Sequence, residues 1–183
     1  MVRYATTING INSIYYSNST VKTTIESWYN TNLSSYDNLI VSEMYCEQSR
    51  VVYATNNRTT NNEILYTSYT PTFKCSNDNT GHGVINAKIG LLSVDEVRYA
   101  GGQFYINNAN NYLTIASAGF WTMSPGGVDK ADASYGCVWP LKATGAIGTN
   151  QLINSYSIRP VINLKADIHV SGAGTSSDPY VVK

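Results

Sequence analysis

Histidine and cysteine side chains are the groups with which this chain could carry out nucleophilic or acid–base chemistry. Its two histidines are His82 in "TGHGV" and His169 in "DIHVS". The chain has no G-x-S-x-G turn, the signature of one large class of nucleophilic serine. A nucleophile could still meet a histidine in space, because catalytic partners need not be neighbours in the sequence. Nothing in the spacing singles out such a pair, so we expect no catalysis.

Oxygen-bearing side chains in two segments could bind a cation. "NDNTG" at residues 77–81 partly resembles a calcium-binding loop, but the twelfth position, where an acidic ligand is required, is Lys88. "GGVDKAD" places Asp129 and Asp132 close together, which is typical of a solvated turn. We therefore expect no metal and no cofactor.

The three cysteines include no C-x-x-C pair, so neither a zinc site nor a thioredoxin-like motif is expected. Cys46 in "YCEQS" and Cys75 in "FKCSND" have polar, loop-like surroundings, and we predict a disulfide between them. It would join the ends of a long loop over residues 50–83, which are rich in turn-forming residues. Cys137 in "YGCVWPL" has apolar, strand-like surroundings, where we expect a buried thiol.

Charge and composition exclude several classes of protein. Twelve Lys and Arg residues balance twelve Asp and Glu residues, so there is no basic excess to bind nucleic acid. No apolar run reaches the length of a membrane span, and we expect no membrane insertion. The first residues lack the apolar segment of a signal peptide, so a secretion signal would lie upstream of this chain. The 15 Tyr residues are typical of extracellular β-rich domains and binding surfaces, although Tyr also simply favours strands.

Two segments before residue 103 carry helix signals. Val21, Ile25, Trp28 and Tyr29 fall on one helical face, which predicts a helix over residues 20–30 with Ser19 or Thr20 as its cap. In "KIGLLSVDEVRYAGG", residues 89–92 predict a short buried strand. A capping box from Ser93 to Glu96 then begins a helix that the Gly pair at 101–102 ends. Helix-start chemistry explains the acidic pair Asp95 and Glu96.

The rest of the chain predicts short strands. The runs "YLTIAS", "GFWTMSP", "SYGCVWPL", "IRPVINLK" and "DPYVVK" are bounded by Gly, Pro, Asn and Ser. Pro160 lies near the start of its strand, where a missing N–H does least harm.

These segments together resemble a known family. The order "STVKTTIESWY", "NLSSY", "PTFKC", "IGLLSVDEVRYAGG", "FWTMSP", "IRPVINLKAD" and "GTSSDPYVV" is similar to a C-terminal module of large surface proteins from gut Firmicutes. That module is a divergent relative of the C-type-lectin fold, near the formylglycine-generating-enzyme and Fibrobacter major-paralogue branches. The resemblance covers residues 19–183.

The resemblance implies an α+β fold: one C-type-lectin-like domain over residues 1–183, excised from or truncated relative to a larger protein. A helix-and-loop half would precede a small twisted antiparallel sheet, with the "FWTMSP" and "RPV" strands at its centre. The tail would form a closing β-hairpin that turns at Gly172 and Gly174. Arg159 would make structural hydrogen bonds.

The resemblance also implies a recognition face over residues 126–156. Aromatic rings and amides there could bind a sugar or a peptide, and the candidate residues are Asp129, Asp132, Tyr135, Trp139, Asn150, Asn154 and Tyr156. Strand alternation puts Tyr135, Cys137 and Trp139 on one face. If Val138 faces inward, the two rings are exposed; if Cys137 does, both are core.

The function that follows is non-catalytic. We expect an extracellular or cell-surface recognition or display module of a bacterial protein, with a glycan or protein ligand and with other domains of a parent protein beside it. The alternative is a structural spacer without a ligand. A formylglycine-generating oxidoreductase is least expected, because that activity needs two nearby cysteines in the C-terminal half, where only Cys137 lies. The sugar-binding calcium motifs of C-type lectins are also missing.

Overall fold

A computed structural model describes residues 1–6, 13–47, 70–75, 83–108, 110–114, 118–128 and 136–183. Its helices, in chain order, are η2 (Tyr16–Asn18), α1 (Thr20–Asn32), η3 (Ser34–Leu39) and α3 (Val94–Tyr99), of which η2 and η3 are 3-10 helices. Its strands are β1 (Val2–Arg3), β2 (Ile40–Val41), β3 (Glu43–Cys46), β4 (Val84–Ala87), β5 (Ile89–Gly90), β6 (Gln103–Phe104), β7 (Phe120–Val128), β8 (Gly136–Leu141), β9 (Ala146–Ile147), β10 (Asn150–Gln151), β11 (Ser155–Tyr156), β12 (Val161–Leu164), β13 (Val170–Ser171) and β14 (Val181–Val182). The mixture of helices and strands confirms the α+β class.

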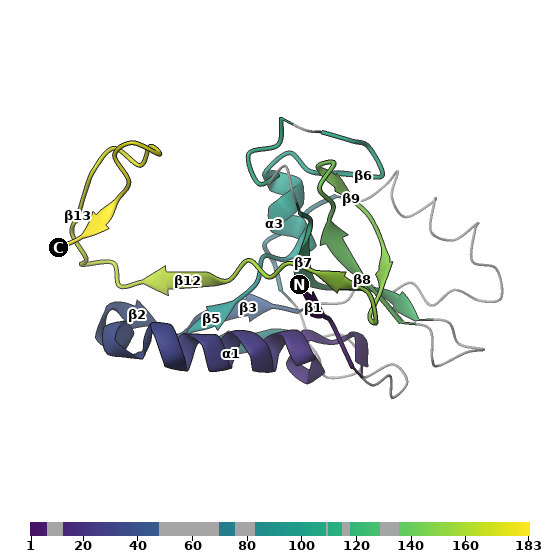
Figure 1. Ribbon diagram of the computed structural model, residues 1–183, viewed down its shortest axis with the longest axis horizontal. Helices are drawn as coiled ribbons and strands as arrows, with labels where there is room; N and C mark the ends of the chain where they lie inside the picture. The colour runs from purple at the N-terminus through teal and green to yellow at the C-terminus, as the bar shows by residue number, and fades with distance from the viewer. Residues whose placement is uncertain (7–12, 48–69, 76–82, 109, 115–117, 129–135) are drawn as a thin grey trace.

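Helix α1 runs along one side of the molecule (Figure 1). The Ser19 hydroxyl accepts a hydrogen bond from the Lys22 N–H at 3.0 Å and caps the helix, as predicted. Val21, Ile25 and Tyr29 are buried in the core. The sequence pattern placed Trp28 on the same face, but its side chain is 45% exposed. It lies at the edge of the buried stripe, so its large ring extends past the packed surface.

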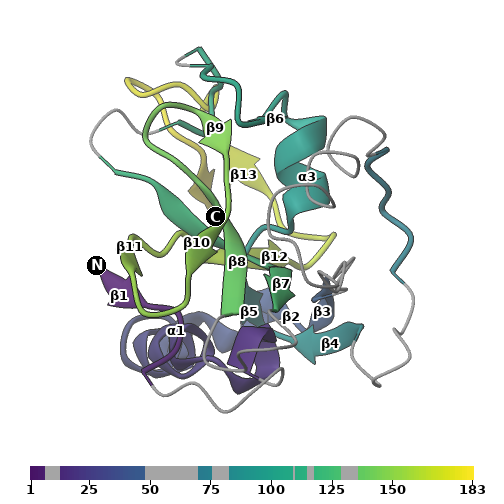
Figure 2. The same ribbon diagram turned by 90° about the vertical axis from the view of Figure 1, so that its right-hand side faces the viewer.

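Strands β2 to β5 form a forked hairpin. β3 and β4 pair antiparallel along their full length, from Glu43 opposite Ala87 to Cys46 opposite Val84. Next to this ladder, β2 and β5 diverge from each other. β12 lies between them, antiparallel to both, and we call this place the fork. The chain therefore returns from its C-terminal part to close a gap between two segments of the N-terminal half (Figure 2).

The five-stranded sheet lies between two hydrophobic clusters. Its strand order is β10-β8-β9-β6, with β7 also paired to β8. Trp121 and Val138 belong to the cluster covered by α1, whereas Phe120 and Trp139 pack in the cluster that includes residues of α3. Strands β7 and β8 are thus buried on both faces, which is why their sequences are apolar without clean alternation.

The N-terminal residues contribute more to the core than their polar sequence suggests. Tyr4, Ile14, Tyr15 and Tyr16 are all buried, and β1 pairs with β11. The Trp121 indole N–H donates to the Val2 carbonyl oxygen at 2.8 Å. The described residues at this end of the chain therefore contribute to the folded core.

The arrangement differs from one sheet with the "FWTMSP" and "RPV" strands at its centre. These strands are β7 and β12, and they belong to separate sheets of five and three strands. Not every pairing is antiparallel, because β6 and β9 are parallel. The expectation of a single antiparallel sheet was therefore wrong. The difference arises because β12 fills the fork between β2 and β5.

The C-terminal hairpin is confirmed. β13 pairs with β14, and Gly172 and Gly174 between them have φ values of 97° and 74°. These values favour glycine. In Figure 1 the hairpin stands apart from the rest of the molecule. Among the described residues, no helix has both the length and the apolar character needed to cross a membrane.

Candidate functional site

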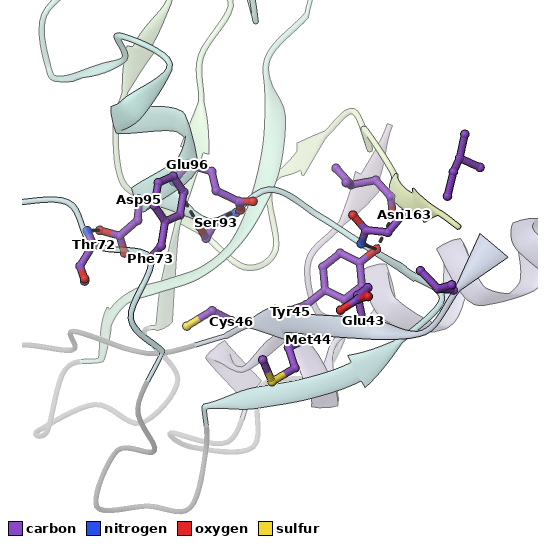
Figure 3. Close-up of a pocket in the computed structure, with 13 residues that line it drawn as sticks. Glu43, Met44, Tyr45, Cys46, Thr72, Phe73, Ser93, Asp95, Glu96 and Asn163 are labelled. Atoms are coloured by element: carbon purple, nitrogen blue, oxygen red, sulfur yellow. Dashed lines mark hydrogen bonds between the residues drawn. The ribbon is translucent and has the colours of Figure 1, made fainter. Parts of the chain in front are cut away.

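A groove of about 380 Å³ opens beside the fork, where β12 lies between β2 and β5. Figure 3 shows the 13 residues that line it. They come from β2 and β3, from residues 72–73, from the start of α3 and from β12. Its volume lies within the range of small-ligand pockets, about 300–1,000 Å³.

Tyr45 holds one side of the groove. Its hydroxyl donates to the Val161 carbonyl oxygen at 3.0 Å and accepts from the Asn163 side-chain amide at 3.1 Å. Its ring packs directly over Gly90, where an added Cβ would lie 2.4 Å from a ring carbon. Burial raises the pKa of Tyr45 to about 12, so the hydroxyl keeps its proton at physiological pH. Tyr45 thereby joins β3 to both β5 and β12.

The predicted disulfide is present and builds the opposite wall. Cys46 and Cys75 are bonded, with their Cα atoms 5.6 Å apart, and so tie β3 to residues 70–75. The Phe73 ring stacks on Tyr99 at 4.3 Å between centroids. The Thr72 N–H donates to Asp95 Oδ1 at 2.9 Å. These contacts fix the segment that carries Phe73 against α3.

Carboxylates give the groove its charge. Glu96 completes the capping box, because its Oε2 accepts from the Ser93 N–H at 2.6 Å while Ser93 Oγ accepts from the Glu96 N–H at 3.2 Å. This confirms the predicted start of α3. Asp95 is held by Thr72, and Glu43 lies on the β3 side. No Lys, Arg or His occurs among the described residues that line the groove.

Three of the predicted recognition residues come together elsewhere. The Asn150 side-chain amide donates to the Tyr156 hydroxyl at 2.6 Å, and Asn154 Nδ2 donates to Asn150 Oδ1. The Tyr156 ring also packs against Trp121, with centroids 4.7 Å apart. These contacts stabilise the turn between β10 and β11. Ligand binding by Asn150, Asn154 and Tyr156 stays a prediction.

Trp139 lies in the core. Its side chain is only 8% exposed, and its ring packs edge-on against Phe104 at 4.8 Å between centroids. Val138 on the opposite face is also buried. Both faces of β8 are therefore buried, whereas each of the two alternatives expected from strand alternation buried only one face. Cys137 lies outside the disulfide and is half-buried. Asp129, Asp132 and Tyr135 lie outside the described residues.

The possible catalytic and metal-binding residues offer no assembled site within the part of the chain that the structure describes. No three His, Cys, Asp or Glu side chains there are grouped to hold a metal ion. His169 is exposed just before β13. His82 and residues 77–81 lie outside the described residues. Arg159 donates to the Leu113 carbonyl oxygen at 2.7 Å and lies over the Phe120 ring, as expected of a structural arginine.

Sequence reasoning did not find the groove. Met44, Tyr45 and Phe73 carry no motif, and Asp95 was explained fully by the start of α3. The one signal that pointed here was the predicted disulfide, because it brings "YCEQS" and "PTFKC" side by side.

Comparison with known proteins identifies no relative. No protein-family model, curated protein or solved structure matches the chain.

Proposed function

We propose that this chain is a non-catalytic, extracellular recognition module of a bacterial surface protein and that it binds a glycan or protein ligand in the groove. The observation that carries the proposal is the groove itself, which contacts from several distant segments hold in shape. A site that is ordered before binding loses less conformational entropy when the ligand arrives.

The rim of the groove supports recognition. Met44 and Phe73 are each 71% exposed, although they are large apolar side chains. Exposed apolar side chains beside a concave surface are typical of binding sites. A spacer domain would gain nothing from exposing large apolar side chains along a groove.

The disulfide supports the location. Disulfides persist mainly in oxidising compartments, which include the outside of the cell. The resemblance to the C-type-lectin-like module of surface proteins agrees with this placement and remains part of the proposal.

Arrays of glycans and of peptides, probed in calcium and again in EDTA, test the proposal. We expect the wild-type protein to bind a defined subset, and Met44→Ser and Phe73→Ser to weaken that binding at least about ten-fold, because each removes a large apolar side chain that lines the groove. Tyr112→Ser is the matched control, because Tyr112 is 77% exposed and does not line the groove. Urea unfolding of each variant confirms that it remains folded.

Three results would count against the proposal. Binding that both groove variants retain, but that Asn154→Ala loses, would move the site to the turn between β10 and β11. Binding lost in EDTA would point to a cation site that this account does not include. Blank arrays would favour the spacer function.

A further inference from the structure

Strand β3 has one paired edge and one open edge. It forms a two-stranded sheet with β4, and no other strand of the described residues pairs with it. The open edge of a strand carries a row of backbone N–H and C=O groups that another extended chain can bind. The open edge of β3 is therefore a surface on which a further strand can pair.

The register of the β3–β4 pair shows which backbone groups lie on the open edge. Opposite residues of an antiparallel pair alternate between those that exchange hydrogen bonds and those that do not. The Glu47 N–H donates to the Gly83 carbonyl oxygen at 2.8 Å, which places the bonded positions at the odd-numbered residues of β3. The N–H and C=O groups of Met44 and Cys46 therefore point away from β4, toward the open edge.

The groove follows this edge. Every residue of β3, from Glu43 to Cys46, lines the groove, whereas none of the described residues 84–87 of β4 does. Ser93 and Phe73 line the groove opposite β3 (Figure 3). A wall that faces the open edge favours a single extended segment as the occupant over the broad sheet of a second copy.

Most polar side chains of the groove are engaged within the chain. The Tyr45 hydroxyl bonds to β12 both as donor and as acceptor. Ser93 and Glu96 form the capping box of α3, and Asp95 accepts from the Thr72 N–H. The backbone of β3 is therefore the main row of hydrogen-bonding groups that the groove offers to a ligand.

We propose that the groove binds an extended peptide segment of a partner protein, which adds as a strand to the open edge of β3. This inference rests on the proposed function and names its ligand class. The backbone groups of Met44 and Cys46 repeat every two residues, about 6.6 Å apart, and an extended peptide presents its own N–H and C=O groups at the same repeat. The hydroxyl groups of a glycan have no such repeat, so the open edge favours the peptide.

Backbone N-methylation of a bound peptide tests the inference. We would select linear peptides on the wild-type protein from a phage library of random octapeptides and methylate the backbone nitrogens of one selected peptide singly. Each methyl group removes an N–H donor and leaves the side chain unchanged. Within the bound stretch, we expect methylation at every second residue to weaken binding about ten-fold, because a hydrogen bond is lost. Methylation at the residues between should have little effect, as isothermal titration calorimetry would show.

Met44→Pro tests the same contact from the side of the protein. Proline removes the Met44 N–H, which points away from β4, so the β3–β4 ladder keeps its hydrogen bonds. Met44→Ser is the matched control, because it removes the same side chain and keeps the N–H. We expect Met44→Pro to weaken the peptide about ten-fold beyond Met44→Ser. Urea unfolding shows whether both variants fold, and if Met44→Pro does not, the methylated peptides decide alone.

An empty peptide selection, equal effects at every methylated position or equal binding by Met44→Pro and Met44→Ser would overturn the inference. If array ligands still bind in a manner sensitive to Phe73→Ser, the groove remains a recognition site and only the strand-adding peptide is wrong. If neither Met44→Ser nor Phe73→Ser affects any ligand, the proposed function fails as well.

Discussion

The Tyr45 hydroxyl donates a hydrogen bond to the Val161 carbonyl oxygen across 116 residues of sequence. The Tyr45 hydroxyl oxygen in turn accepts a hydrogen bond from the Asn163 side-chain amide. The Tyr45 side chain thus connects β3 to β12 at the fork between β2 and β5. The groove opens beside it.

We expect Tyr45→Phe to destabilise the protein by about 1–2 kcal/mol, because it leaves two partly buried polar groups without this partner. Urea unfolding measures the loss. Tyr36→Phe is the control, since Tyr36 is 56% exposed and should show no comparable change. An unchanged urea midpoint for Tyr45→Phe would mean that the hydrogen bonds of the Tyr45 hydroxyl to β12 do not stabilise the fold.

Gly90→Ala should cost about 1–3 kcal/mol, the usual effect of overpacking, because the new methyl group meets the Tyr45 ring. The test is a double-mutant cycle with Tyr45→Ala, analysed by urea unfolding. Removing the ring should relieve most of the cost and give a coupling of about 1 kcal/mol or more. Additive effects would show that the clash lies elsewhere.

Loss of the disulfide should weaken both the fold and the groove. Cys46 and Cys75 are 29 residues apart, and a loop of that length corresponds to roughly 3–4 kcal/mol of stabilisation in the chain-entropy description. We expect Cys46→Ser/Cys75→Ser to lower stability by an amount of this order and to weaken array binding. Dithiothreitol should reproduce the binding loss in the wild type and add nothing in the double variant. Full binding under reduction would contradict a structural role at the groove.

The Asp37 carboxylate should show a Lys88-dependent titration. Hydrogen bonds from Lys88 and from the Tyr29 hydroxyl lower the pKa of Asp37 below its ordinary value. Because the folded-state pKa is the lower one, these contacts stabilise the protein above the unfolded-state pKa and are lost as the pH falls through the folded-state pKa. Lys88→Met should raise the Asp37 pKa, measured by carboxyl-carbon NMR. Lys165→Met should not, and a pKa unchanged by Lys88→Met would exclude the contact.

Local chemistry explains what the sequence predicted correctly. The Ser19 cap, the Ser93 capping box and the turn at Gly172 and Gly174 each depend on a few adjacent residues. The disulfide was predictable because only one pair of cysteines had matching polar surroundings.

Longer-range features were not predictable in this way. Val138 and Trp139 are neighbours in β8 but belong to different hydrophobic clusters, and no alternation pattern reports burial on both faces. The groove is lined by segments that start near residues 41, 72, 93 and 161. Its lining is complete only in the folded protein, where β12 pairs with β2 and β5, so no local sequence pattern reports it.

The three methionines provide the most direct test that the groove is the recognition site. Met44 lines the groove, Met1 is 85% exposed at the N-terminus, and Met123 is buried. We would label the methionine methyl groups with carbon-13 and titrate the protein with a ligand identified on the arrays. We expect the Met44 methyl resonance to shift with ligand concentration, while the resonances of Met1 and Met123 stay in place. Saturable binding that leaves the Met44 resonance unmoved would contradict it.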